Sequence, residues 1–376
     1  MTAMRRVYLD GNATTPLDPR VRAAMDPWLD CGNASSLHAE GRAARAAIDR
    51  AREQVAALVG ARPREIVFTS GATESNALAL LGVVRANGVR RVACSAVEHP
   101  SVLLALEALR PGLDLALLGV GRDGRVSADA HVPPDAGLLA LMLANNETGA
   151  VMPVAAVAAR AKATGALVFS DAAQACGKMA VDVDGLGADL LSLSAHKMHG
   201  PKGAGALYVR TGVRLAALSR GGEHERGMRP GTEDVAALVG LGAAAELSAR
   251  ELSDRRGRWS ALRASFLERI RAAALGARIH SPEDGLPNTI SLAFPGVPGD
   301  SLLAGLDLAG VAVSVGSACA SGAAEPSHVL LAMGVTREEA SQSLRVSFHA
   351  GTSENDLAAC LNALARCVKG LRDARR

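Results

Sequence analysis

The stretch Asp189-Leu190-Leu191-Ser192-Leu193-Ser194-Ala195-His196-Lys197-Met198-His199-Gly200-Pro201-Lys202-Gly203 changes abruptly from apolar to polar residues. Its apolar part is short and lies between glycines and a Gly-Pro pair, which favours a buried strand over a helix. In open α/β sheets the carboxyl ends of the strands face the ligand crevice, so we expect Lys197 to lie beside a bound ligand. A lysine amine removed from water can form a Schiff base with a carbonyl group. The alternative is a solvated loop lysine, which is the commoner case for an isolated lysine, so support must come from the rest of the chain.

The chain has 376 residues, of which 49% are hydrophobic and 21% charged, and this composition is typical of a globular protein with two or three domain-sized units. No apolar run approaches the roughly 18 residues of a membrane helix, and no signal peptide precedes Asp10, so we expect no membrane association and a cytoplasmic location. The net charge of +3 is spread along the chain, which argues against direct nucleic-acid binding. The six cysteines lack the spacing of a metal site or a disulfide framework, so no metal is expected.

Apolar runs that predict strands are followed repeatedly by residues able to carry chemistry. Helical segments separate these runs, which implies right-handed crossovers and a mainly parallel sheet. Because the carboxyl ends of parallel strands share one edge, the polar residues should converge there. Core packing alone gives no reason for this pattern. The runs and the residues that follow them are 66–69 with Thr73, 92–95 with His99, 138–144 with Asn146, 167–169 with Asp171, and 189–193 with Lys197.

The C-terminal part of the sequence predicts a second, smaller domain. A polar, glycine-rich loop over 221–232 leads into a helical region over 233–275, and an interruption at 254–257 is interpreted as the hinge. We therefore predict a large domain over 15–256 and a small domain built from 1–14 and 257–376, which carries a loop with Cys319. The strand-like and helical runs of the small domain are 288–294, 300–308, 311–313, 344–348 and 354–371.

Two short motifs fit an anion and a pyridine ring. Ser70-Gly71-Ala72-Thr73 places backbone N–H groups at a helix start, where a phosphate would bind, although an ordinary capped helix is the alternative. Asp171 follows an apolar strand, and a carboxylate at a nearly dry position needs a cationic partner. The protonated nitrogen of pyridoxal phosphate (PLP) would be such a partner, and Gln174 could donate to the phenolate oxygen of its ring. A helix-capping Asp171 is the alternative.

Three further residues are candidates for the reaction itself. His99 could stack on a cofactor ring and move protons, because histidine has a pKa close to neutrality. Cys319 lies among small residues that would expose its sulfur, although an unperturbed thiol is only about 3% thiolate at pH 7. Arg345 alternates with Leu344 and Val346 along a strand and suits bidentate capture of a carboxylate. The alternatives are a capping histidine, an incidental cysteine and an arginine in solvent.

Several motifs in sequence order together resemble the PLP-dependent cysteine desulfurases, which are similar to class V aminotransferases and serve iron–sulfur cluster and thio-cofactor assembly. The resemblance runs nearly from end to end of the chain. The motifs are Tyr8-Leu9-Asp10-Gly11-Asn12-Ala13-Thr14-Thr15-Pro16, Thr69-Ser70-Gly71-Ala72-Thr73-Glu74-Ser75-Asn76, Glu98-His99-Pro100-Ser101, Asn145-Asn146-Glu147-Thr148-Gly149, Asp171-Ala172-Ala173-Gln174, Ser194-Ala195-His196-Lys197, Gly316-Ser317-Ala318-Cys319-Ala320-Ser321-Gly322 and Arg345-Val346-Ser347.

The resemblance implies an α/β protein of the PLP-dependent transferase fold type I, with a mainly parallel seven-stranded sheet and a smaller α/β domain. It implies that Lys197 bonds the cofactor, Asp171 pairs with the pyridine nitrogen, Gln174 binds the phenolate oxygen and His99 stacks on the ring. Cys319 would attack the sulfur of the bound L-cysteine, keep it as a persulfide and leave L-alanine. The phosphate ligands would be Ala72, Thr73, Ser194 and His196, with Thr232 from the other subunit of a homodimer; the substrate ligands would be Asn146 and Arg345.

The resemblance leaves the sulfur acceptor open. The chain has His224 where the family more often has Gln, in a loop that the resemblance places at the dimer interface. It resembles the shorter members, whose C-terminal tail for scaffold docking is absent, so an iron–sulfur scaffold protein is only one expected acceptor. A selenocysteine lyase or another lyase of the same fold is a second interpretation. A non-catalytic sulfur carrier is a third, against which Lys197, Asp171 and His99 argue together.

Overall fold

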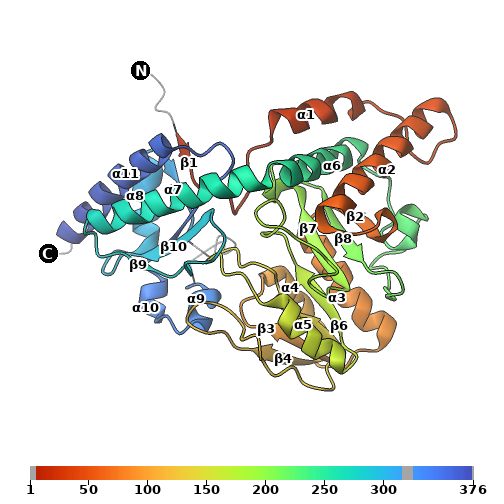
Figure 1. The fold of residues 1–376 in the computed structure, drawn as a ribbon, viewed down its shortest axis with the longest axis horizontal. Coiled ribbons are helices and arrows are strands. Elements are labelled where there is room, and N and C mark those ends of the chain that lie inside the picture. Colours follow the sequence, from red (N-terminus) through yellow and green to blue (C-terminus); the bar gives the residue numbers. More distant parts are fainter. Residues whose placement is uncertain (1–5, 316–324, 375–376) are drawn as a thin grey trace.

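The computed structural model describes residues 6–315 and 325–374, and a seven-stranded sheet forms its largest layer (Figure 1). β8 runs antiparallel to both of its neighbours, and the other adjacent pairs are parallel. The predicted fold class is therefore confirmed. In spatial order the strands are β2 (Ile66–Thr69), β8 (Gly205–Val209), β7 (Leu190–Ser194), β6 (Leu167–Asp171), β5 (Leu138–Ala140), β3 (Arg91–Ser95) and β4 (Asp114–Leu118).

The antiparallel strand β8 brings β2 into line with the parallel strands. Because β2 and β7 both run opposite to β8, they point the same way. The carboxyl ends of β2, β3, β5, β6 and β7 consequently lie along one edge of the sheet, which we call the carboxyl edge. This is the convergence that the sequence predicts.

Helices cover both faces of the large sheet, as a parallel sheet requires. Alternate strand residues enter two hydrophobic clusters: Leu190 packs with α3 and α4, whereas Leu191 and Leu193 pack with α2, α5 and α6 on the other face. The bounds of these helices are α2 (Ala39–Val59), α3 (Ala72–Asn87), α4 (Pro100–Glu107), α5 (Val154–Ala163) and α6 (Val235–Arg250). A shorter helix, α1 (Pro19–Met25), packs on α6.

A second, smaller sheet has its own hydrophobic cluster, which includes Trp259, Phe266, Phe294, Phe348 and Leu357. Its strands are antiparallel and lie in the order β12-β10-β9, and a separate parallel pair joins β1 to β11. The elements are β1 (Val7–Tyr8), α7 (Leu252–Ala272), β9 (Arg278–Ile279), β10 (Thr289–Ala293), α8 (Gly299–Leu308), β11 (Val311–Ala312), α9 (His328–Ala332), α10 (Arg337–Ala340), β12 (Ser343–Ser347) and α11 (Glu354–Asp373).

The long helical region breaks earlier than the sequence predicts. Helix α6 ends at Arg250 and α7 begins at Leu252, so Glu251 marks the break and residues 254–257 lie inside α7. Figure 1 shows α7 running from the end of α6 across the small sheet. The proposed boundary between 256 and 257 thus falls within a helix, and the division into domains stays a prediction. Among the described helices, none combines the length and the hydropathy needed to cross a bilayer.

Candidate active site

The start of α3 forms a small cradle at the carboxyl edge. Its N-cap residue is Gly71, with a φ of 153°, and no side chain among the described residues caps the helix there. Ser194, the last residue of β7, lies beside it: a Cβ built on Gly71 would be 3.8 Å from Ser194 Oγ. That hydroxyl is buried and has no hydrogen-bond partner within the described part of the chain. A helix N-terminus carries about half a positive charge, so a buried hydroxyl beside unbonded N–H groups fits a phosphate.

Asp171 is held at the end of β6 by two donors. The carboxylate is only 5% exposed, and it accepts hydrogen bonds from Ala173 N (2.9 Å) and from Asn76 Nδ2 (2.8 Å). Asn76 Nδ2 also donates to Ser101 Oγ (2.8 Å), which lies 2.8 Å from His99 Nδ1. The predicted carboxylate and the predicted stacking histidine are therefore connected through Asn76 and Ser101.

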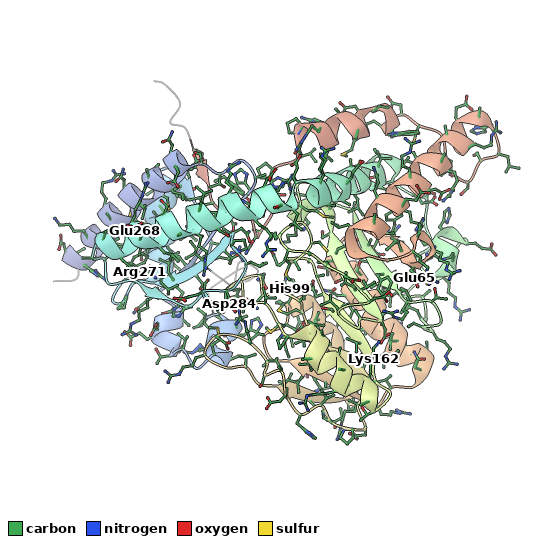
Figure 2. The ribbon with its side chains drawn as sticks, in the orientation of Figure 1. Glu65, His99, Lys162, Glu268, Arg271 and Asp284 are labelled. Carbon is green, nitrogen blue, oxygen red and sulfur yellow. The ribbon has the colours of Figure 1, made fainter. Side chains whose placement is uncertain are left out.

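His99 is the N-cap of α4, and its hydrogen bonds define its protonation. The backbone N–H of Ser101 donates to His99 Nδ1 (3.1 Å), so the neutral ring carries its proton on Nε2. Burial lowers the pKa of His99; Asp171 opposes the shift and Lys197 adds to it. Figure 2 places His99 near the middle of the molecule, between the two sheets.

Lys197 ends the short 3₁₀ helix η3 (Ala195–Lys197), which follows β7 directly. Its Nζ donates to Asn12 O (2.5 Å) and Ala13 O (2.9 Å), in the loop after β1. Gln174 Nε2 donates to the same Asn12 carbonyl (2.9 Å). Lys197 and Gln174, which the resemblance assigns to one ring, therefore meet at one backbone oxygen.

His196 lies under the same loop. Its Nδ1 is 3.1 Å from Thr14 Oγ1, and its backbone oxygen accepts hydrogen bonds from Thr15 N and Thr15 Oγ1 (both 2.9 Å). Burial, with a further contribution from Lys197, lowers the pKa of His196 to about 4. His196 is thus neutral at pH 7 and can offer one N–H to an anion without adding a charge.

Arg345 and Asn146, the predicted substrate ligands, come together although Arg345 is in the small sheet and Asn146 lies in a turn after β5 of the large sheet. Arg345 is 2% exposed, which excludes the alternative of an arginine in solvent. Its Nη2 pairs with Asp10 Oδ1 (2.7 Å) and its Nη1 donates to Asn146 O (3.1 Å). Arg345 Nε is buried and has no partner among the described residues. A guanidinium with an unused N–H at the carboxyl edge suits a carboxylate ligand.

Two predicted residues are not brought into this group. Thr232 is exposed and lines a hollow of about 140 Å³ with Ser70 and Arg229, beside the start of α3. Cys319 lies outside the described residues. The residues that flank its segment lie at the site: Ser314 forms a bridge to Arg345, and His328 Nε2 lies 3.0 Å from Glu98 O.

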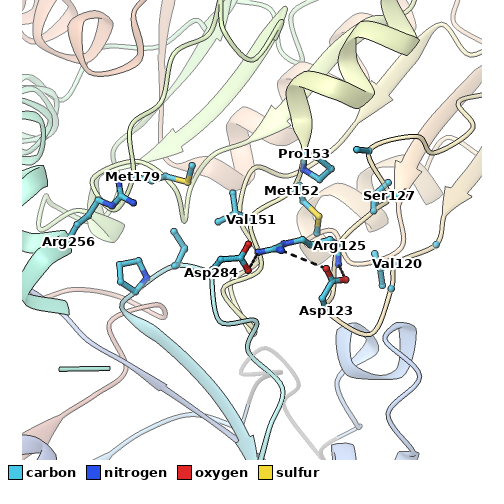
Figure 3. Close-up of a pocket in the computed structure, with 17 residues that line it drawn as sticks. Val120, Asp123, Arg125, Ser127, Val151, Met152, Pro153, Met179, Arg256 and Asp284 are labelled. Atoms are coloured by element: carbon cyan, nitrogen blue, oxygen red, sulfur yellow. Dashed lines mark hydrogen bonds and ion pairs between the residues drawn. The ribbon is translucent and has the colours of Figure 1, made fainter. Parts of the chain in front are cut away.

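A large cavity lies elsewhere in the described part of the chain. It has a volume of about 860 Å³ and is shown in Figure 3. Its lining includes Val120, Met179 and the ion pair of Arg125 with Asp284 (2.6 Å). The predicted site residues that the structure describes do not line it, so its size gives no reason to move the site from the carboxyl edge.

The sequence interpretation gave no role to several residues that organise this site. Asn12 and Asn76 lie within the quoted motifs, yet the backbone carbonyl of Asn12 accepts from Lys197 and Gln174, and the side-chain amide of Asn76 donates to Asp171. Lys178 was overlooked, although it follows Gln174 by four residues. A lysine inside an otherwise apolar stretch was the available signal, because such a residue is costly to bury without partners.

A mainly parallel sheet with an anion cradle, a lysine and a buried carboxylate at its carboxyl edge defines a PLP-dependent enzyme of fold type I. The chain belongs to the aminotransferase class-V family, whose model matches residues 7–360. It is 43% identical to the cysteine desulfurase of Gluconacetobacter diazotrophicus, over 98% of this chain and 95% of the relative. It is 40% identical to the putative cysteine desulfurase IscS 1 of Bacillus subtilis, over 98% of this chain and all of the relative.

Solved structures give the same result. A NifS-like protein superposes with a TM-score of 0.91 at 35% identity, covering 97% of this chain and 100% of that one. DndA from Streptomyces lividans superposes with a TM-score of 0.76 at 37% identity, covering 90% of this chain and 99% of that one. The cofactor of this family of enzymes is PLP, and the cradle, Lys197 and Asp171 fit that molecule.

Proposed function

We propose that this chain removes sulfur from L-cysteine with PLP bound at the carboxyl edge, releases L-alanine and keeps the sulfur as a persulfide on Cys319. The chain is a PLP-dependent cysteine desulfurase. One observation carries the assignment of the residues: Ser194, whose buried hydroxyl has no partner among the described residues, lies beside the start of α3, three residues before Lys197 and on the strand next to that of Asp171. This is the set of partners that a phosphate, an aldehyde and a pyridine nitrogen need.

In this proposal each polar residue of the edge has one task. Ser194, His196 and the first N–H groups of α3, at Ala72 and Thr73, hold the phosphate. Lys197 holds the cofactor covalently, Asp171 keeps the pyridine nitrogen protonated and Gln174 donates to the phenolate oxygen. When bound, PLP supplies an electron sink for bonds broken at the substrate. The stacking of His99 leaves its Nε2–H available for proton transfer near Lys197.

Arg345 and Asn146 would orient the substrate through its carboxylate. Arg345 Nη2 is committed to Asp10, so its buried Nε is the N–H available to a ligand. A solved structure of SspA contains bound cysteine, and SspA is 33% identical to this chain. This similarity supports cysteine as the substrate.

Three of the five described cysteines are poor nucleophiles because they are buried. Burial raises the pKa of Cys94, Cys176 and Cys360, to about 12 for the last two, so these thiols stay protonated. In the proposed step the Cys319 thiolate attacks the substrate sulfur, a sulfur–sulfur bond forms and the carbon–sulfur bond breaks. Bound PLP would accept the electron pair of that bond and would let alanine form on protonation, so the step would need no external oxidant.

We further propose a cytoplasmic homodimer in which Thr232 reaches the phosphate of the partner subunit. An iron–sulfur scaffold protein is the proposed sulfur acceptor, since several relatives are named IscS. Direct binding of nucleic acid is not part of the proposal.

The test is to supply PLP and L-cysteine to the purified protein and to measure alanine and protein-bound persulfide. Cys319→Ala should abolish the persulfide, whereas Cys31→Ala, a matched change at a partly exposed cysteine, should not. Full persulfide formation by Cys319→Ala would refute the assignment of Cys319 as the nucleophile. Faster turnover of L-selenocysteine, retained by Cys319→Ala, would favour a selenocysteine lyase instead.

A further inference from the structure

A buried ammonium group lies directly behind the candidate PLP site. Lys178 is 2% exposed, and its Nζ donates to Asn12 Oδ1 (2.9 Å) and to Gln174 Oε1. Within residues 6–315 and 325–374, no carboxylate forms an ion pair with it. A lysine held only by two amide oxygens in the protein interior contributes little to stability, so its position calls for another explanation.

The two partners of Gln174 admit one orientation of its amide. Lys178 Nζ donates to the Gln174 amide, so this contact favours the Gln174 oxygen as its acceptor. The Asn12 carbonyl only accepts, so it requires the Gln174 NH2 group, which donates to it at 2.9 Å. Without Lys178, the Asn12 carbonyl alone would hold the Gln174 amide in this orientation.

Lys178 constrains Asn12 in the same manner. Asn12 Oδ1 accepts from Lys178 and from Asn288 Nδ2 (3.0 Å), which turns Asn12 Nδ2 toward Asn146 O (3.0 Å) and Thr289 Oγ1 (2.8 Å). The loop whose carbonyls receive Lys197 is thereby tied to both sheets.

We propose that Lys178 is a positioning residue, which fixes the Gln174 amide with its NH2 group toward the phenolate oxygen of PLP. The inference rests on the proposed function, because that function places Gln174 beside the ring. The surrounding charge agrees with it: burial, Lys197 and Arg345 all lower the pKa of Lys178, and a bound anion would offset this excess of positive charge.

The first experiment compares PLP binding by the apoproteins of wild type and Lys178→Met. We expect the variant to bind PLP about tenfold more weakly, as for the loss of one hydrogen bond to a charged group. We also expect its visible absorption band to change shape at fixed pH, because the phenolate loses a donor in part of the molecules. Lys162→Met is the matched control: Lys162 pairs with Asp189 (3.0 Å) and lies well away from His99 in Figure 2.

The second experiment tests whether Lys178 acts through Gln174. Gln174→Ala should weaken PLP binding by a similar factor, and adding Lys178→Met to it should cost less than about twofold more. Additive losses, or a Lys178→Met protein that binds PLP with wild-type affinity and spectrum, would overturn the proposal.

If Lys178→Met does not fold, Lys178→Gln replaces it, since its amide can donate and accept and no longer dictates the orientation of Gln174. Wild-type binding by Lys178→Gln would overturn the proposal equally. Failure of the wild-type apoprotein to bind PLP would refute the proposed function itself, whereas normal wild-type binding with an unaffected variant would refute only the role of Lys178.

Discussion

Helices α3 and α11 begin in opposite ways. At α11, Asp356 Oδ2 accepts hydrogen bonds from Ser353 N (2.9 Å) and Ser353 Oγ (2.6 Å), while Ser353 Oγ accepts from Asp356 N (3.3 Å), so the protein satisfies its own groups. At α3, the N-cap is Gly71, and within residues 6–315 and 325–374 no side chain accepts a hydrogen bond from the first turn in this way. The capped start stabilises the fold, and the uncapped start is left available for an anion. Substitutions at the carboxyl edge should therefore change cofactor binding and catalysis, and substitutions at α11 should change stability alone.

The largest effect is expected for Lys197→Ala. Loss of the covalent attachment should lower cysteine desulfurase activity on the order of 10³-fold or more, as for removal of a catalytic nucleophile. Borohydride reduction followed by mass spectrometry should detect bound cofactor in the wild type and none in the variant. Lys202→Ala, an exposed lysine of the same loop, should keep both properties. Detection of covalently bound cofactor in Lys197→Ala would contradict the assignment of Lys197 as the residue that bonds PLP.

Asp171→Asn should follow, with a loss of roughly 10² to 10³ in kcat/KM, because a neutral amide cannot keep the pyridine nitrogen charged. The fold should survive, since Asn76 Oδ1 has no partner among the described residues and can turn to accept from the new NH2 group. Steady-state kinetics would measure the loss, with the exposed Asp184→Asn as control. Equal kcat/KM values for both variants would contradict the role of Asp171.

Acid should destabilise the contact between His199, which follows the carboxyl edge, and Ala350, which precedes α11. His199 accepts from Ala350 N (3.2 Å) near the start of α11, and burial lowers its pKa to about 4. An unfolded histidine titrates near 6.5, so the unfolded state takes up the proton first as the pH falls. This stabilisation is complete above pH 6.5 and should fall by about 1.4 kcal/mol per pH unit toward pH 4. Urea unfolding of wild type and His199→Asn should show a shallower pH dependence for the variant; parallel curves would contradict it.

Ser194→Ala should separate binding from stability. The hydroxyl has no partner among the described residues, so the apoprotein should unfold at the same urea concentration as the wild type or a slightly higher one. PLP affinity should fall about tenfold with the loss of one bond to the phosphate. Titration of both apoproteins with PLP, and separately with inorganic phosphate, would measure this. A destabilised apoprotein with normal PLP affinity would reverse the interpretation of the cradle.

The smallest effect is expected at the capped helix. Ser353→Ala should lower the free energy of unfolding by about 1 kcal/mol, because one N–H of α11 loses its acceptor. PLP affinity should stay that of the wild type. A change in PLP affinity comparable to that of Ser194→Ala would show that the two helix starts do not differ in function.

The sequence predicted the strands that have clear ends and missed those without them. The predicted runs 66–69 and 189–193 are largely apolar and end in polar residues, and the structure confirms strands there, at Ile66–Thr69 and Leu190–Ser194. β4 (Asp114–Leu118) was missed because it is an edge strand with partly exposed residues, including Leu117 at 58%, so its pattern resembles that of a loop.

The candidate site was predictable only in part for a related reason. Short motifs indicated which side chains lie at strand ends. The convergence of parallel strands then predicted that these side chains lie together at one edge of the sheet. The contacts between the sheets depend on tertiary packing: Arg345 with Asp10, and Asn12 with Lys178, join residues more than 160 positions apart in the chain. Strand alternation places Arg345 and Leu344 on opposite faces of the strand. Only the packed structure shows that the face with Arg345 is buried as well as the face with Leu344.

The antiparallel strand β8 also sets an order of events during synthesis. β2 pairs within the large sheet only with β8, so residues 66–69 have no strand partner until residues 205–209 have left the ribosome. Gly71 follows β2 in the chain and is synthesised well before Ser194, so the two can come together only after β8 has paired with β2. A nascent chain shorter than about 210 residues therefore cannot assemble the pocket for the vitamin-derived group, and loading must await translation of more than half of the message.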